Sequence, residues 1–162
     1  MKLQSKNEQL LVLTDVIKVL AASKEPNNQY VIFEESVPPL GGPPPHTHPD
    51  EEVFYILEGE FEFILNDLEN PFKALAGSVV HVPSNAIHTF KNTGQSVGKM
   101  IVIITPGNLM DYFRVIGRQL DGITDLPNLN VVPDFSKLNL EKAFKYAGEY
   151  NIEFILPQLI KN

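Results

Sequence analysis

Residues 41–60, GGPPPHTHPDEEVFYILEGE, contain the residue spacing that decides the fold. Two of the four histidines in this 162-residue chain, His46 and His48, lie here one residue apart, and Glu52 follows closely. Side chains alternate between the two faces of a β-strand, so His46, His48 and Glu52 share one parity. A strand that continues through them, with a kink at Pro49, would bring two imidazoles and a carboxylate to one face. These groups are ligands of a divalent transition metal.

A fourth ligand has to come from elsewhere, and the remaining histidines are His81 and His88. His88 follows the turn sequence 83–85 and begins a predicted strand, so a hairpin reaching back across a barrel would bring it to the other three. His81 lies in the run SVVHV, on the same face as Val79. We predict a structural or solvent-facing role for His81, with a pocket residue as the alternative.

Short runs of β-branched and aromatic residues recur about every ten residues, and turn sequences separate them. This spacing predicts an all-β protein built as an antiparallel sandwich or barrel. The runs are LLVL and VIKVL (10–20), YVIFEESV (30–37), EVFYIL (52–57), EFEFIL (60–65), SVVHV (78–82), HTFKN (88–92) and KMIVIIT (99–105).

The pattern changes after Thr105. Apolar residues at helical spacing in PGNLMDYFRVIGRQL predict a helix, which either covers the barrel mouth or packs on the outer sheet. NLEKAFKYAG predicts a second helix with Asn139 as its N-cap and Gly148 as its terminating glycine. YNIEFIL could form a last strand. The expected organisation is an N-terminal strand segment over 1–28, a barrel over 29–106, and C-terminal helices with a short strand over 107–162.

Composition narrows the function classes. The chain has no cysteine, which excludes disulfides, thiolate metal ligands and thiol nucleophiles. A net charge of −7 without a basic run argues against binding to nucleic acid or to an anionic membrane. Asp15 and Lys18 interrupt the apolar residues near the N-terminus, so we expect neither a signal peptide nor a transmembrane span, and we predict a cytoplasmic protein.

Several other residues in the chain allow two interpretations. Asp50 and Glu51 could form a catalytic carboxylate pair, but a solvated acidic loop is the favoured interpretation. The aromatic residues Phe54, Phe61, Phe63 and Phe90 could line a pocket, although core packing is favoured for each of them.

The spacing of these residues resembles the two motifs of the cupin superfamily. The first motif is represented by Gly41-Gly42, His46-Thr47-His48, Glu52 and Gly59, and the second by Gly77, Pro83, His88 and Asn92. The leading glycine is one residue closer to the first histidine than the family pattern has it. Asn85 replaces a turn glycine, and we expect the turn to survive because asparagine tolerates a positive φ.

The resemblance implies a double-stranded β-helix, the cupin jelly-roll barrel, with a C-terminal helical appendage. It also implies one divalent transition metal (iron, manganese, nickel, copper or zinc) with His46, His48, Glu52 and His88 as ligands. The chain is similar in more detail to bacterial quercetin-dioxygenase-like cupins, through GGPPPHTHPDEEVFYILEGE and the predicted helix after the barrel. That similarity implies that Glu52 is also the catalytic base for a substrate hydroxyl.

Two function classes follow. The first is a mononuclear metal-dependent oxygenase that acts on a small organic substrate, for example an aromatic or enolic diol. The second is a non-catalytic module that binds a small molecule or a metal, for instance a metabolite sensor. The complete set of metal ligands argues against a third class, a metal-independent sugar isomerase. Because an apolar edge strand invites pairing, LLVLTDVIKVL predicts a homodimer.

Overall fold

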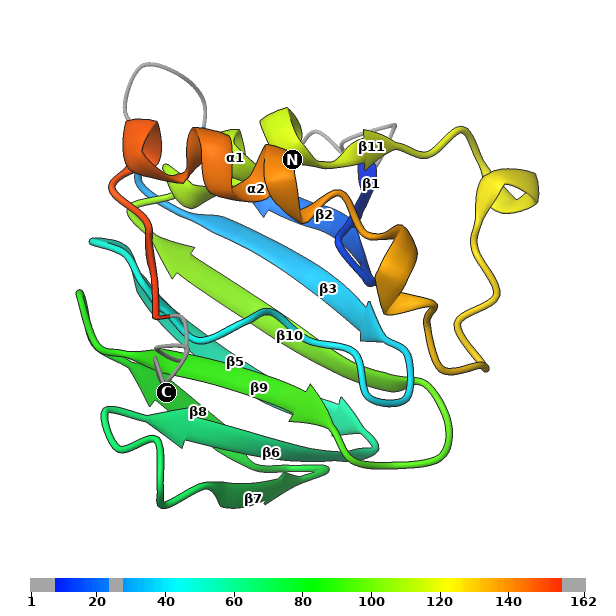
Figure 1. The fold of residues 1–162 in the computed structure, drawn as a ribbon, viewed down its shortest axis with the longest axis horizontal. Coiled ribbons are helices and arrows are strands. Elements are labelled where there is room, and N and C mark those ends of the chain that lie inside the picture. Colours follow the sequence, from blue (N-terminus) through cyan, green and yellow to red (C-terminus); the bar gives the residue numbers. More distant parts are fainter. Residues whose placement is uncertain (1–7, 24–27, 156–162) are drawn as a thin grey trace, which may run out of the picture.

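Two antiparallel β-sheets face each other and form the body of the protein (Figure 1). The structure is a computed structural model that describes residues 8–23 and 28–155. It has the predicted all-β jelly-roll architecture with a short helical part near the C-terminus. No helix in the described ranges is long and apolar enough to cross a membrane.

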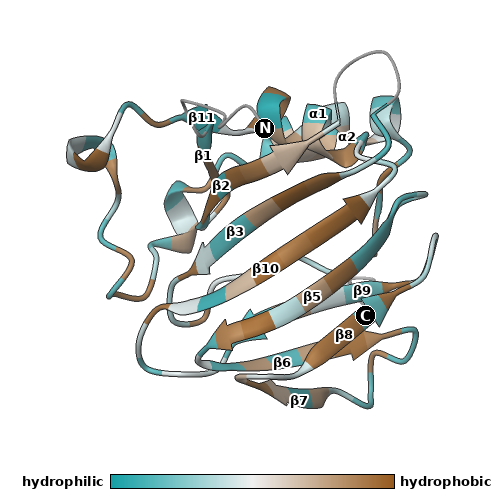
Figure 2. Cartoon of the chain, turned by 180° about the vertical axis from the view of Figure 1, so that it is seen from behind, coloured by the Kyte–Doolittle hydropathy of each residue, from teal (hydrophilic) through white to brown (hydrophobic). Residues whose placement is uncertain are grey.

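The first sheet has the strand order β11-β1-β2-β3-β10-β5-β8. Its strands are β1 (Gln9–Val12), β2 (Asp15–Ala22), β3 (Val31–Val37), β5 (Glu51–Glu58), β8 (Val79–Val82), β10 (Gly98–Thr105) and β11 (Arg118–Gln119). Apolar residues follow the central strands β3, β10 and β5 (Figure 2). The buried residues of β3 and β10 alternate with more exposed ones, because one face of the sheet packs on the core.

The second sheet has the order β12-β4-β9-β6-β7. Its strands are β4 (His46–Thr47), β6 (Glu60–Leu65), β7 (Phe72–Leu75), β9 (His88–Asn92) and β12 (Glu153–Phe154). All of the predicted strand runs form strands, including the last one. The sequence predicted β4 only as part of a longer strand through Glu52, and it did not predict β7 or β11.

Aromatic side chains from both sheets fill the space between the layers. Phe54 packs against Phe63 and Phe90 with ring centroids 5.3 Å and 5.7 Å apart in edge-on geometry. Phe61 is fully buried among them. Core packing is therefore confirmed for these four residues, and aromatic pairs in this arrangement add stability beyond the area that they bury.

Two turns need a residue with a positive φ, and the residue types at these positions are ones that tolerate it. Gly42 has φ +134°, and a Cβ atom there would lie 2.1 Å from the carbonyl oxygen of Phe90, so only glycine fits. Asn85 has φ 60°, as expected for the residue that replaces a turn glycine.

The helices lie together at the end of the sheets formed by the N-terminal hairpin (Figure 1). They are α1 (Leu109–Ile116) and α2 (Leu140–Ala147), accompanied by the 3-10 turns η1 (Ile123–Asp125), η2 (Phe135–Lys137) and η3 (Gly148–Tyr150). The Tyr112 hydroxyl donates a hydrogen bond of 2.8 Å to the carbonyl of Ala143, which joins the two helices.

The N-cap of α2 is predicted correctly, but its terminating residue is not. The Asn139 side chain accepts a hydrogen bond from the backbone N–H of Lys142. Gly148 keeps a right-handed helical conformation with φ −62° and begins η3. Asn151 takes the left-handed conformation instead, with φ 56°, so the helical path ends three residues later than predicted.

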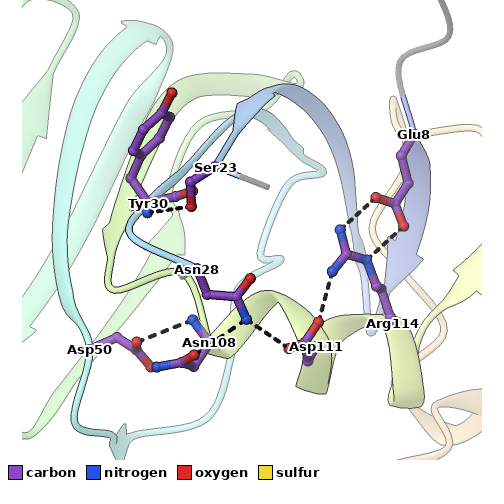
Figure 3. Close-up of polar contacts among 8 residues, drawn as sticks. All are labelled: Glu8, Ser23, Asn28, Tyr30, Asp50, Asn108, Asp111 and Arg114. Carbon is purple, nitrogen blue, oxygen red and sulfur yellow. Dashed lines mark hydrogen bonds and ion pairs between the residues drawn. The ribbon is translucent and has the colours of Figure 1, made fainter. Parts of the chain in front are cut away.

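Polar contacts tie α1 to segments that are distant in the sequence (Figure 3). Arg114 donates to Asp111 on its own helix and, through two nitrogen atoms, to both carboxylate oxygens of Glu8. Asn28 donates to the other oxygen of Asp111 at 3.3 Å. These contacts are mostly exposed, so they contribute little to the free energy of unfolding and mainly orient α1.

The edge of β1 is paired within the chain, which removes one argument for dimerisation. Leu10 and Leu11 pair with Gln119 and Arg118 of β11. On its other side β1 pairs with β2, and the hairpin extends the first sheet beside β3.

The homodimer stays a prediction, and an unpaired β1 edge no longer supports it. Sedimentation equilibrium at micromolar concentration tests it, and twice the 18.1 kDa chain mass is the expected result. A monomer mass under those conditions would refute it.

Asn92 offers a test of how the barrel is held together. It is fully buried, and its side-chain nitrogen donates to the carbonyls of Val37 and Ser96, while its oxygen accepts from Gly94 N–H. We expect Asn92→Ala to lower the free energy of unfolding by about 2–4 kcal/mol, because it leaves buried backbone groups unpaired. Urea denaturation measures the change. The exposed Asn130, changed to Ala, is the matched control, and equal effects of the two substitutions would contradict this account.

Candidate metal centre

The predicted ligands come from both sheets. His46 lies on β4 and pairs in register with His88 at the start of β9, so the second sheet supplies both of these imidazoles. Glu52 lies on β5 of the first sheet. His48 lies between β4 and β5, where the chain crosses from one sheet to the other.

The predicted continuous strand from His46 to Glu52 is therefore wrong. Strand β4 ends at Thr47, and residues 48–50 form a bend before β5 begins. The carbonyl of His48 accepts a 2.8 Å hydrogen bond from Asn85 N–H, which anchors the crossing segment to the turn before His88. The crossing, and not alternation along one strand, brings Glu52 to the histidines.

Three imidazoles converge at this point. One ring nitrogen from each of His46, His48 and His88 lies within 4.8 Å of the others, a grouping that could hold a metal ion. The ring centroids of His46 and His88 are 4.3 Å apart, and those of His48 and His88 are 4.8 Å apart. His48 and His88 are buried, whereas His46 is partly buried.

Backbone carbonyls orient two of these rings. The Nδ1–H of His46 donates to the carbonyl of Pro44 at 2.8 Å, and that of His88 donates to the carbonyl of Ala86 at 2.9 Å. Since a carbonyl can only accept, both Nδ1 atoms carry hydrogen, which leaves Nε2 of each ring as the nitrogen that can bind a metal once it is unprotonated. Metal-ligating histidines are held in the same way, with the non-ligating nitrogen bonded to a carbonyl or a carboxylate.

Glu52 contacts two of the three histidines. Its Oε2 lies 2.9 Å from His88 Nε2 and 3.4 Å from His48 Nε2. Burial alone would raise the pKa of Glu52, but His48 and His88 outweigh burial and hold the pKa well below its usual range. Glu52 therefore carries a negative charge inside the barrel, as a carboxylate ligand of a divalent cation must.

His48 is the observation that tests whether a metal fits. It is 1% exposed, and neither of its ring nitrogens has a hydrogen-bond partner in the described structure. Its contact with Glu52, at 3.4 Å, is long for a hydrogen bond. Buried polar atoms without a partner are uncommon and point to an ion or a ligand. The three histidines and the adjacent carboxylate fit a divalent transition metal.

The protonation states of His46 and His48 differ. Burial is the main cause that lowers the pKa of His46 to about 3, and the neighbouring His88 and His48 add to it, so His46 is neutral. Burial lowers the pKa of His48 too, but Glu52 and Asp50 outweigh burial and raise it. A proton held by His48 has to leave before that ring can bind a metal.

The predictions for the residues beside the cluster are confirmed in some cases and wrong in others. His81 is exposed and contacts Glu51 at 3.2 Å, so its predicted solvent-facing position is confirmed. Glu51 is exposed, as the solvated-loop interpretation expects, but it begins strand β5, and Asp50 is buried, so the interpretation is wrong for Asp50. Asp50 Oδ1 accepts a hydrogen bond from the backbone N–H of Asn108, just before α1 (Figure 3). This partner is distant in the sequence, which is why local composition did not predict it.

A cavity adjoins the cluster and gives about 60 Å³ of space that water molecules can enter. His46, Glu52 and His88 form part of its wall, and Phe54 and Phe90 line it as well as packing in the core. Helix α1 closes one side with Leu109, Tyr112, Phe113 and Ile116. Of the two predicted positions for this helix, the structure supports the one over the barrel mouth.

Two further residues of the cavity wall, Asp15 and Glu35, were not predicted as site residues. Asp15 is 4% exposed and Glu35 is 7% exposed. A signal was present in the sequence, because Glu35 shares its parity on the strand with Val31, Phe33 and Val37, all of which face the core. A carboxylate at a core parity position indicates a buried polar role.

The arrangement defines a class of protein. It is a double-stranded β-helix with three convergent histidines at one end of its cavity. Residues 33–104, a little under half of the chain, match the family model of the cupin domain.

Several known proteins are similar to parts of this chain. Auxin-binding protein 1 of Arabidopsis thaliana is 32% identical over 81 residues, which cover 46% of this chain and 41% of that protein. The match therefore spans well under half of that relative. A structure described as a predicted oxalate decarboxylase from Thermotoga maritima aligns with a TM-score of 0.55 and 20% identity, over 64% of this chain and 96% of that one.

An RmlC-like cupin from Shewanella frigidimarina also aligns with a TM-score of 0.55, at 18% identity, over 65% of this chain and 89% of that chain. At these identities the solved structures show the shared fold. None of these three comparisons singles out the quercetin-dioxygenase-like group.

The buried carboxyl groups of Asp15 and Glu35 predict that the stability of the fold depends on pH. Burial is the largest cause that raises the pKa of Asp15 from 3.8 to about 7, and burial together with the charges of Asp15 and Glu52 raises that of Glu35. The folded state then holds protons that the unfolded chain releases, so the stability contribution is complete below pH 3.8 and is lost as the pH rises to about 7. Asp15→Asn should flatten this fall by about 1 kcal/mol per pH unit.

Urea denaturation of both proteins at a series of pH values across this window measures the effect. The matched control is Glu34→Gln, which removes a carboxyl group on the outward face of β3, next to Glu35. A stability difference between wild type and Asp15→Asn that does not change with pH would show that Asp15 titrates normally.

Proposed function

We propose that the protein is a mononuclear metal-dependent oxygenase that acts on a small organic substrate. The observation that carries the proposal is the convergence of His46, His48 and His88 beside the charged Glu52, with both nitrogens of the buried His48 unpartnered. In this proposal, the four residues hold one divalent metal from the set iron, manganese, nickel, copper and zinc. Both atoms of O₂ enter the organic product, so the reaction consumes no external reductant.

A bound metal would act as a Lewis acid that lowers the pKa of a coordinated substrate hydroxyl. Glu52 is the residue proposed to accept the proton. Its low pKa is set by its contacts with His48 and His88, so it becomes a better base only when those contacts lengthen. The apolar cavity wall of Phe54, Phe90 and Phe113 would exclude water from the reacting groups.

The size of the cavity supports a small substrate. About 60 Å³ of accessible space corresponds to a few water molecules. A polycyclic molecule such as a flavonol would require α1 to move away from the barrel. We therefore place the substrate among small carbonyl, enol or carboxylate compounds.

A non-catalytic binding module is the second candidate, and one observation favours it. The curated relative at 32% identity is named for binding auxin, a small organic ligand. In this alternative the same cluster holds a metal that anchors a ligand without turnover. Oxygen consumption distinguishes the two candidates.

Metal content of the purified protein is the first test. We expect about one transition-metal ion per chain near neutral pH, where histidine ligands are unprotonated. His88→Ala should weaken metal binding at least tenfold to a hundredfold, roughly the loss seen when supporting groups of a metal site are removed. Elemental analysis and competition with a chelator measure this effect.

His81→Ala is the matched control, because His81 is an exposed histidine outside the cluster. Thermal unfolding of each variant checks that it is folded. Unchanged metal content in folded His88→Ala protein would refute the metal centre. Oxygen uptake by the metal-loaded wild type with small enols and hydroxy acids supports the oxygenase, while tight binding of these compounds without uptake supports the binding module.

A further inference from the structure

Asp15 and Glu35 form a second polar part of the cavity wall, separate from the His–Glu cluster. Asp15 lies on β2 and Glu35 on β3. Glu35 pairs in register with Ile17, two residues after Asp15, so the two carboxyl groups lie diagonally across neighbouring strands on the inner face. Both residues line the same cavity as His46, Glu52 and His88.

The hydrogen bonding of this pair is incomplete. The Thr14 hydroxyl donates to Asp15 Oδ1 at 2.6 Å. The two carboxyl groups are close enough to share a hydrogen bond when one of them is protonated. Within residues 8–23 and 28–155, no backbone N–H, lysine, arginine or histidine donates to either group. Glu35 is thus a side chain more than nine-tenths buried that faces the cavity with acceptor lone pairs left over. Buried acceptors in this state favour a ligand that donates to them.

The rest of the wall leaves few other polar contacts. Ile17, Phe33, Phe113 and Ile116 are apolar. The hydroxyl of Tyr112, which also lines the cavity, is engaged with a backbone carbonyl of α2. A ligand in the cavity therefore meets polar groups at the His–Glu cluster and at the Asp15–Glu35 pair, and apolar side chains between them.

We infer that the cavity takes a small bifunctional molecule, with an oxygen ligand for the metal and a hydrogen-bond donor for Asp15 and Glu35. The oxygen belongs to a carboxylate, a carbonyl or an enol, and the donor is a hydroxyl or an ammonium group. This inference rests on the proposed function, because the metal centre supplies the first anchor. It narrows the substrate class to short hydroxy or amino compounds and assigns a specificity role to two residues outside the cluster.

The physical basis is the difference between a ligand with the donor and its analogue without it. An analogue with a hydrogen atom in place of the donor leaves the buried acceptors unpaired after water has been expelled. Because a buried acceptor that is left unpaired costs free energy, the donor-bearing ligand is favoured by about tenfold to a hundredfold in affinity.

Calorimetric titration of the zinc-loaded protein tests the inference without turnover, because zinc has no redox chemistry. The probes are matched sets: glycolate, glycine and acetate, then β-hydroxypropionate, β-alanine and propionate. We expect the hydroxy or the amino member of at least one set to bind about tenfold to a hundredfold more tightly than the unsubstituted acid. The comparison of hydroxy with amino members identifies which donor the pair prefers.

Asp15→Asn and Glu35→Gln, which keep the side-chain shape, should each remove most of this preference and leave the zinc stoichiometry unchanged. Glu34→Gln, on the outward face of β3, should keep the preference. Loaded wild-type protein that binds no probe, or binds each set equally, overturns this inference alone, as does a preference that survives both variants. Failure to load zinc or another divalent metal overturns the metal centre and this inference with it.

Discussion

The buried charge of Glu52 is the constraint on which the site depends. A carboxylate removed from water in an apolar barrel is strongly unfavourable unless it has partners. Glu52 has two, His88 at 2.9 Å and His48 at 3.4 Å, and they come from the other sheet and from the crossing segment. The charge thereby links the two layers of the fold at one end of the cavity. The hydrogen bond from Asn85 to His48 and that from Asn108 to Asp50 hold the crossing segment in place.

The sequence predicted which side chains come together, but it predicted their local geometry poorly. The spacing of His46, His48 and Glu52 pointed to side chains that the structure brings close to one another. The same spacing is compatible with one strand or with a crossing between two sheets, and alternation cannot tell them apart. The crossing depends on Asn85, a contact that no local pattern contains.

The buried carboxyl groups show a related limit. Asp50 looked like part of a solvated loop because Glu51 and Glu52 follow it, yet its partner Asn108 lies 58 residues away. Glu35 broke the apolar alternation of its strand, and that break was the readable sign of a polar cavity wall. Strands such as β4 and β11 have two residues each and carry no periodic signal. Most of the fold followed from alternation and turn residues, while the unpredicted parts are contacts between distant segments.

Equal burial has opposite consequences at the two polar parts of the cavity. Glu52 lies beside imidazoles, and its pKa falls. Asp15 and Glu35 lie beside each other, and their pKa values rise because burial and, for Glu35, a neighbouring carboxyl disfavour the charged form. The firmly ionised carboxylate of the wall is therefore at the histidine cluster, where a cation would bind. The other end can hold a shared proton and exchange hydrogen bonds with a ligand. Helix α1 closes the space between them, and its hydrogen bond to Asp50 connects its position to the segment that carries His48 and Glu52. Movement of α1 that admits a ligand would break that bond and leave a buried Asp50 oxygen unpaired, so access to the cavity and the geometry of the histidine cluster are physically coupled.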